Sequence, residues 1–311
     1  MAGVGCVHEA VMKKQELYSP SVDGVHQLHT LLWIPEGEVK AVLQIVHGMS
    51  EHIARYDEFG RYLAERGVAV VGHDHLGHGL TAKDADELGF FGWPDGNEYL
   101  IGDIHRTREK TGFRFPGVPY YILGHSMGSF LTRQYLGIHG EGLAGAVIMG
   151  TSHLPDALLM ASEQLCLWMG KRKGWRYRSP LIDSFIIRGF EKKLGIGWLS
   201  KNDANNRKYQ DDPMCGYAFT LNGFYHFFRT VRLANGLEAA GRMPKDMPIL
   251  FTASGEDPVG HNGADVKTVF RRYSKHGAQV ELKLYDGMRH EILNEVDRMT
   301  VYKDIYDWMK L

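Results

Sequence analysis

Apolar positions follow two different spacings along this chain, and the two spacings alternate. Short apolar and β-branched runs such as VAVVGHD (68–74) are typical of strands buried on both faces. Between them, segments such as ARYDEFGRYLAERG (54–67) carry apolar residues at helical spacing. The expected strands cover 27–35, 39–48, 68–74, 119–126, 143–150, 248–254 and 279–287, and the expected helices cover 54–67, 97–112, 129–140, 262–277 and 292–311.

The alternation predicts an α/β fold in which a mostly parallel central sheet has helices on both faces, because parallel strands are joined by right-handed crossovers. Residues 153–243 break the rhythm, since they are rich in aromatic residues at helical rather than strand spacing. We therefore expect a core built from 1–152 and 244–311, with 153–243 inserted as a helical cap or lid.

Composition narrows the classes of function. Of 311 residues, 44% are hydrophobic and 23% charged, and the net charge of −1 argues against whole-protein electrostatic binding to nucleic acid. Cys6, Cys166 and Cys215 are far apart, which fits a reducing compartment better than a disulfide framework. No signal peptide or membrane-spanning run is visible, so a soluble, cytoplasmic protein is expected.

The pentapeptide GHSMG (124–128) carries the strongest chemical signal. It joins the expected strand YYILG to the expected helix SFLTRQYL. A serine on such a sharp turn has a strained backbone that exposes its hydroxyl, and the helix behind it favours a developing negative charge. We predict that Ser126 is a catalytic nucleophile.

A serine nucleophile needs a base, and the base needs a carboxylate that orients it. In folds with this strand–serine–helix turn, the acid and then the histidine follow the serine along the chain. Asp257 follows the strand PILFTAS and His290 follows the strand QVELKLYDG, at the strand ends where ligands gather. We predict Asp257 as the acid, with Glu256 as its nearest competitor, and His290 as the base.

The stretch HGMSEH (47–52) follows an expected strand whose end faces the same side as Ser126. In this position a loop supplies one donor to the oxyanion hole, and the residue after the nucleophile supplies the other. We predict the backbone amides of Met49 and Met127 as these donors.

The same stretch also invites a metal interpretation. A zinc site needs three or four convergent ligands, and this loop offers at most two, so no metal is expected here. DHLGHG (74–79) follows a strand and is interpreted as a structural loop that braces the site. Glu51, His52 and Asp103 either contact a polar substrate head or anchor loops through buried hydrogen bonds.

Taken together, HGMSEH, DHLGHG, GHSMG, GEDPVG (255–260) and MRHEILNE (288–295) resemble the monoacylglycerol lipase and lysophospholipase group of α/β-hydrolases. The resemblance covers about 25–152 and 245–311, and it implies the same triad and oxyanion donors. The family usually has arginine before GHG, where this chain has Leu76, and that departure concerns local packing.

The inserted segment suggests what kind of substrate is bound. Its large apolar side chains could line a channel for an acyl chain, and we single out Phe185, Trp198 and Phe224 as substrate-binding candidates. Residues 171–208 hold eleven Lys or Arg against three Asp or Glu. This segment is either a solvated helical face or a surface that meets anionic lipid. Equal association with liposomes that contain or lack anionic lipid would exclude the second interpretation.

The sequence thus favours a serine hydrolase that cleaves acyl-glycerol or lysophospholipid-like esters and needs no cofactor. A short-chain carboxylesterase, a thioesterase and an amidase stay open, because the same triad serves all of them. A non-catalytic ligand-binding protein is the alternative from another class, and the complete triad argues against it.

Overall fold

A single mixed sheet organises the computed structural model, which describes residues 12–186 and 188–311. Within these residues the strand order is β1-β2-β4-β3-β5-β6-β7-β8. β1 and β2 are antiparallel to their neighbours, and β3 to β8 are parallel. The strands are β1 (Lys13–Pro20), β2 (Gln27–Ile34), β3 (Ala41–Val46), β4 (Val68–His73), β5 (Tyr120–His125), β6 (Gly145–Met149), β7 (Pro248–Ser254) and β8 (Gln279–Tyr285).

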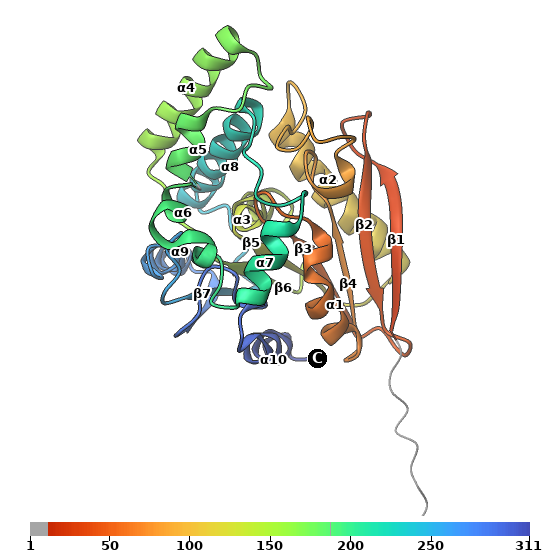
Figure 1. Cartoon of the computed structure of the whole chain (residues 1–311). Helices are drawn as coiled ribbons and strands as arrows, with labels where there is room; N and C mark the ends of the chain where they lie inside the picture. Colours follow the sequence, from red (N-terminus) through yellow and green to blue (C-terminus); the bar gives the residue numbers. More distant parts are fainter. Residues whose placement is uncertain (1–11, 187) are drawn as a thin grey trace, which may run out of the picture.

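The predicted fold class is confirmed, and the additional strand is β1 at the edge of the sheet (Figure 1). Its residues KKQELYSP are mostly exposed, so they lack the continuous apolar run by which the buried strands were recognised. Residues 1–11, which include Cys6 and most of the segment in which no signal peptide was predicted, lie outside the described residues.

Helices cover both faces of the sheet because the central strands bury side chains on both sides. On β5, Ile122 belongs to one hydrophobic core, whereas Tyr121 and Leu123 belong to the other. The first core includes side chains of α2 (Gly96–Arg114), α3 (Met127–His139) and α9 (Ala264–Lys275). The second includes α1 (Asp57–Ala64) and α10 (Arg298–Trp308), which begins later than the predicted helix over 292–311.

The inserted segment between β6 and β7 is helical. It contains α4 (Asp156–Lys173), α5 (Pro180–Ile186), α6 (Arg188–Leu194), a 3-10 helix (Gly195–Trp198), α7 (Asp203–Asp211) and α8 (Leu221–Ala239). Figure 1 shows α4, α5 and α6 together on one side of the molecule, with α8 between α4 and α3. α8 shares the first hydrophobic core with α3, which ties the insertion to the sheet.

Two further properties bear on the sequence-based expectations. Cys166 and Cys215 are buried free thiols. Among the described residues, no helix has the length and apolar content needed to cross a membrane.

Candidate active site

Ser126 occupies the tight turn between β5 and α3. Its backbone has φ 52° and ψ −119°, a left-handed conformation that is strained for a residue with a side chain. Gly128 makes the turn sterically possible, because a Cβ atom there would lie 1.9 Å from the carbonyl oxygen of Val46. The turn can therefore press against the end of β3 only with glycine at this position.

The side chains of Ser126, His290 and Asp257 form a continuous hydrogen-bonded chain. The Ser126 Oγ lies 2.8 Å from His290 Nε2, and His290 Nδ1 lies 3.0 Å from Asp257 Oδ2. Asp257 is fully buried and His290 almost so. Glu256, the alternative candidate for the acid, is half-exposed and pairs instead with Lys201 at 2.7 Å.

This arrangement matches the needs of a serine nucleophile. Burial by itself would lower the pKa of His290, because it disfavours the charged imidazole. The charge and hydrogen bond of Asp257 have the larger combined effect, so the pKa of His290 is raised above its ordinary value. The imidazole can thus take the Ser126 proton while Asp257 stabilises the resulting cation.

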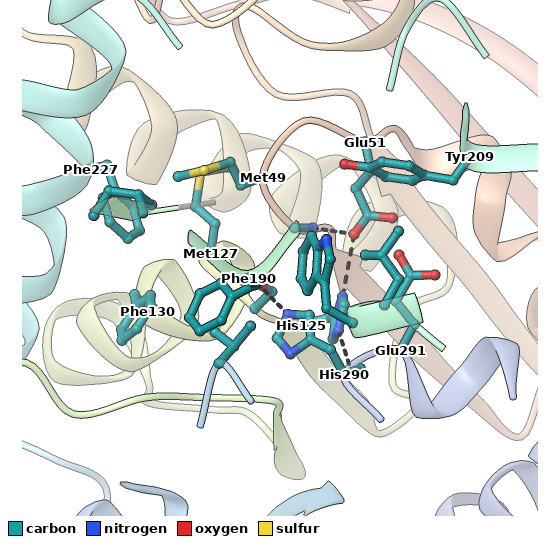
Figure 2. Close-up of a pocket in the computed structure, with 16 residues that line it drawn as sticks. Met49, Glu51, His125, Met127, Phe130, Phe190, Tyr209, Phe227, His290 and Glu291 are labelled. Carbon is teal, nitrogen blue, oxygen red and sulfur yellow. Dashed lines mark hydrogen bonds and ion pairs between the residues drawn. The ribbon is translucent and has the colours of Figure 1, made fainter. Parts of the chain in front are cut away.

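The two predicted oxyanion donors lie beside Ser126. Met49 and Met127 line the same cavity as Ser126 and His290, and Figure 2 shows the two methionine side chains next to one another. Met127 begins α3, where backbone N–H groups lack intrahelical acceptors. A Cβ atom on Gly48 would lie 3.2 Å from Ser126 Cβ, so the loop passes close to the serine.

A buried ion-pair network holds this loop, and the sequence analysis missed it. Glu51 Oε1 accepts the Gly48 N–H at 2.6 Å and the Tyr56 hydroxyl at 2.8 Å. Its other oxygen accepts from Arg55 Nη1 at 2.7 Å, and both terminal nitrogens of Arg55 donate to Glu291, at 2.6 and 2.7 Å. The four-residue spacing of Glu51 and Arg55 was the available sequence signal.

The network connects residues 47–52, named the oxyanion loop here after their predicted role, to the predicted base, because Glu291 directly follows His290. Burial would raise the pKa values of both glutamates, but His125 and Arg55 hold the pKa of Glu51 well below its ordinary value. Arg55 also lowers the pKa of Glu291 against the effect of burial. Both carboxylates are therefore charged and compensated beside the nucleophile.

The remaining polar candidates occupy different places. His52 pairs with Asp212, which follows α7, through an Nε2–Oδ2 contact of 2.8 Å. Asp103 on α2 accepts the Ser21 hydroxyl and the Val22 N–H, both at 2.7 Å. It therefore anchors the turn between β1 and β2, and burial raises its pKa to about 6.

The DHLGHG loop contributes to a buried histidine cluster beneath the oxyanion loop. The His47 ring lies 4.0 Å from that of His75 and 5.1 Å from that of His78, measured between centroids. His47 Nε2 accepts the His75 N–H at 3.1 Å, and His78 Nε2 accepts the Ser50 N–H at 3.4 Å. The cluster thus braces residues 47–50.

Acidification should destabilise the protein through this cluster, which also includes His73, whose ring centroid lies 5.0 Å from that of His75. Burial and the neighbouring imidazoles lower the pKa values of His73 and His78 to about 3 each, and lower that of His75 as well. The folded state then binds fewer protons than the unfolded state, so stability is lost as pH falls from about 6.5 toward 3. In urea titrations at pH 5.5, we expect a loss of about 1 kcal/mol for each of His73 and His78 relative to pH 7.5.

The variant His75→Phe keeps an aromatic ring beside His47 and removes one titrating group, so it should flatten this pH dependence. His261→Gln is the matched control, because the His261 side chain is 72% exposed. Equal unfolding free energies at the two pH values would contradict the expectation.

The space around Ser126 is small and mostly apolar. A cavity of about 70 Å³ is lined by Phe130, Phe190, Trp198 and Phe227, besides the residues already described. An apolar groove of about 430 Å³ lies between α4, α5 and α8, and Ile186 lines both the cavity and the groove.

The three aromatic candidates for substrate binding differ in position. Trp198 lines the cavity, and its ring centroid is 5.7 Å from that of His290. Phe185 lines the groove but is 77% exposed. Phe224 is fully buried, and its ring packs against Phe219 and Phe228. Helical periodicity alone could not separate a core-facing from a cavity-facing phenylalanine.

These features define a serine hydrolase with the α/β-hydrolase fold. They are the mostly parallel sheet, the serine on its strand–helix turn, and the histidine and aspartate hydrogen-bonded to it in sequence. A family model agrees with this class over most of the chain. The model Hydrolase_4, described as serine aminopeptidase, S33, matches residues 37–297. The chain belongs to this family.

Known relatives cover nearly the whole chain. The monoglyceride lipase homolog of Monkeypox virus is 25% identical over 280 residues, which is 89% of this chain and 92% of the relative. The monoglyceride lipase of Rattus norvegicus is 23% identical over 283 residues, covering 89% of this chain and 84% of the relative. The predicted resemblance is confirmed at the level of the family.

Solved structures show the same fold. A thermostable carboxyl esterase from Bacillus coagulans, in complex with glycerol, superposes with a TM-score of 0.87 at 29% identity, covering 96% of this chain and 99% of the other. A soluble variant of monoglyceride lipase from Saccharomyces cerevisiae, in complex with a substrate analog, has a TM-score of 0.75 at 20% identity, covering 95% and 94%.

Proposed function

We propose that this chain hydrolyses carboxylic esters of the acyl-glycerol or lysophospholipid type through an acyl-enzyme on Ser126. The observation that carries the proposal is the Ser126–His290–Asp257 hydrogen-bonded chain at the base of an apolar cavity. His290 removes the Ser126 proton, and Ser126 attacks the ester carbonyl. The oxyanion accepts hydrogen bonds from the amides of Met49 and Met127, and water activated by His290 then releases the acid.

We propose in addition that residues 153–243 form a cap that holds the acyl chain. The cavity beside Ser126, at about 70 Å³, is too small for a long chain, whereas the groove offers about 430 Å³ lined largely by leucine, isoleucine and phenylalanine. Since Ile186 lines both spaces, its side chain limits how far a chain passes from one into the other.

Shortening Ile186 should therefore change the preference for acyl length. We expect Ile186→Ala to raise the ratio of kcat/KM for hexadecanoyl over butanoyl p-nitrophenyl esters by roughly tenfold, because it removes all of the Ile186 side chain beyond Cβ from between the two spaces. A series of monoacylglycerols and lysophosphatidylcholine, with the released acid quantified, then identifies the head group. Leu181→Ala on the same helix is the matched control, since Leu181 is 54% exposed. An unchanged ratio in Ile186→Ala would remove the groove from the proposal.

A short-chain carboxylesterase is the second candidate, and the small cavity favours it. The similarity to the Bacillus coagulans carboxyl esterase supports it as well. The same ester series decides between the two candidates, because a short-chain enzyme loses activity beyond the shorter acids in both the wild type and Ile186→Ala.

An aminopeptidase activity, which the description of the family model suggests, receives less support from this site. Such an enzyme needs a free carboxylate for the cationic amino group of its substrate. The carboxylates that line the cavity, Glu51 and Glu291, are both paired with Arg55.

A further inference from the structure

Three side chains with metal-binding chemistry meet where the oxyanion loop contacts the insertion. They are His52, Asp212 and Cys215, and one ligand atom from each lies within 4.8 Å of the other two. His52 ends the stretch HGMSEH, while Asp212 and Cys215 follow α7. The stretch HGMSEH alone offers at most two ligands. The tertiary structure brings Asp212 and Cys215 to His52 from a segment that begins 160 residues later in the chain.

The backbone holds the two segments together independently of these side chains. Gly216 donates its N–H to the Ser50 carbonyl at 3.0 Å, and the Ser50 hydroxyl donates to the Tyr217 carbonyl at 2.7 Å. Asp212 is fixed in turn, because its Oδ1 accepts the Met214 N–H at 2.8 Å and its carbonyl accepts the Cys215 N–H at 3.0 Å. These hydrogen bonds hold the two segments in place, so ion binding requires shifts of the three ligand side chains but not of the backbone.

The charges around the cluster favour a divalent cation. Four charged side chains interact electrostatically with Cys215. One is a cation, Arg55, and three are anions, Asp212, Glu51 and Glu291. Three carboxylates against one guanidinium leave an excess of negative charge beside Cys215. The cluster also has a route to solvent, because His52 and Asp212 line an open cavity of about 830 Å³.

We propose that His52 Nε2, an Asp212 carboxylate oxygen and Cys215 Sγ bind one Zn²⁺ ion, with water as the fourth ligand. A mixed nitrogen, oxygen and sulfur set suits zinc, whose bonds of about 2.0 to 2.3 Å place ligand atoms roughly 3.3 to 3.6 Å apart. The Cys215 thiol, which lines a neighbouring open cavity of about 390 Å³, loses its proton to solvent as the metal–sulfur bond forms.

Bound zinc would fasten the segment after α7 to the oxyanion loop. His52 is three residues from Met49, and the metal would hold His52 and Asp212 through coordination instead of their hydrogen bond. This site is separate from the Ser126 chemistry, so its test does not depend on the proposed ester hydrolysis.

Metal binding to the full chain tests the proposal directly. Chelator-treated protein should bind one equivalent of Zn²⁺ in a competition titration with a chromogenic chelator. One equivalent of Co²⁺ in place of zinc should give a thiolate-to-cobalt charge-transfer band, which reports a sulfur ligand in the unaltered protein and depends on no variant. Cys215→Ala, Asp212→Asn and His52→Gln should each lose the single tight equivalent.

Cys166→Ala and His261→Gln are the matched controls, since each removes a residue of the same type elsewhere, and both should keep binding and the band. Circular dichroism shows which variants are folded, and only these are scored. No tight equivalent in the wild type, a cobalt complex without the charge-transfer band, or undiminished binding in folded Cys215→Ala would each overturn the proposal.

Discussion

Ser126→Ala should abolish ester hydrolysis, lowering kcat for p-nitrophenyl esters by about 10⁴-fold or more. The hydroxyl that donates to His290 at 2.8 Å is removed, so no acyl-enzyme can form. The fold should persist, because alanine is smaller than serine and leaves the Gly124 and Gly128 contacts of the turn unchanged. Labelling by a fluorophosphonate, which reacts with the activated serine, should disappear in parallel.

Ser274→Ala is the control for this experiment, because Ser274 is an exposed serine near the end of α9. It should retain full turnover and labelling. Turnover by Ser126→Ala that survives removal of trace contaminants would falsify the nucleophile assignment and with it the proposed mechanism.

Arg55→Met should destabilise the protein by about 3 to 5 kcal/mol, the usual cost when one partner of a buried ion pair is removed. Arg55 donates to Glu51 and Glu291 at 2.6 to 2.7 Å, and its own side chain is 9% exposed. Methionine keeps the apolar stem against Tyr209, over whose ring the guanidinium carbon lies 4.9 Å from the centroid. The lost free energy of unfolding therefore reports the cost of leaving two buried carboxylates without a cation. Urea unfolding at pH 7.5 measures this loss.

Two further variants make this result interpretable. Arg298→Met removes an ion pair with Glu58 at the surface, which is worth at most about 1 kcal/mol. Adding Glu51→Gln and Glu291→Gln to Arg55→Met should recover most of the lost stability, because the amides carry no charge. Equal losses in Arg55→Met and Arg298→Met would mean that the network does not stabilise the fold.

Under the proposed mechanism, the network makes Arg55 a positioning residue that acts through Glu51 and Glu291. Glu51 accepts the N–H of Gly48 next to the Met49 donor, and Glu291 follows His290. Asn205 on α7 donates to Glu291 at 2.7 Å and accepts from Arg55 at 3.2 Å, so the insertion takes part as well. The oxyanion loop, the histidine loop and the insertion are thereby held by one buried cation.

The central fold could be predicted from the sequence, and so could the meeting of Ser126, His290 and Asp257, because the signals for both are local. A strand buried on both faces is a continuous apolar run, and β3 to β7 were recognised from such runs. Asp257 and His290 follow the ends of β7 and β8, and parallel strands bring such ends to one edge of the sheet. The edge strand β1 lacks this signature, since its residues are mostly exposed.

Contacts between segments that lie far apart in the sequence could be seen only in the tertiary structure. No spacing along the chain indicates that Arg55 meets Glu291, that His52 meets Asp212, or that Phe224 faces the core while Trp198 faces the cavity. These contacts arise when helices pack at angles set by many side chains at once, which local periodicity does not record. The sequence by itself therefore determined the sheet and the positions of Ser126, Asp257 and His290 at the ends of its strands. Long-range packing decided the ion-pair network, the shape of the cavity and the histidine–aspartate–cysteine cluster.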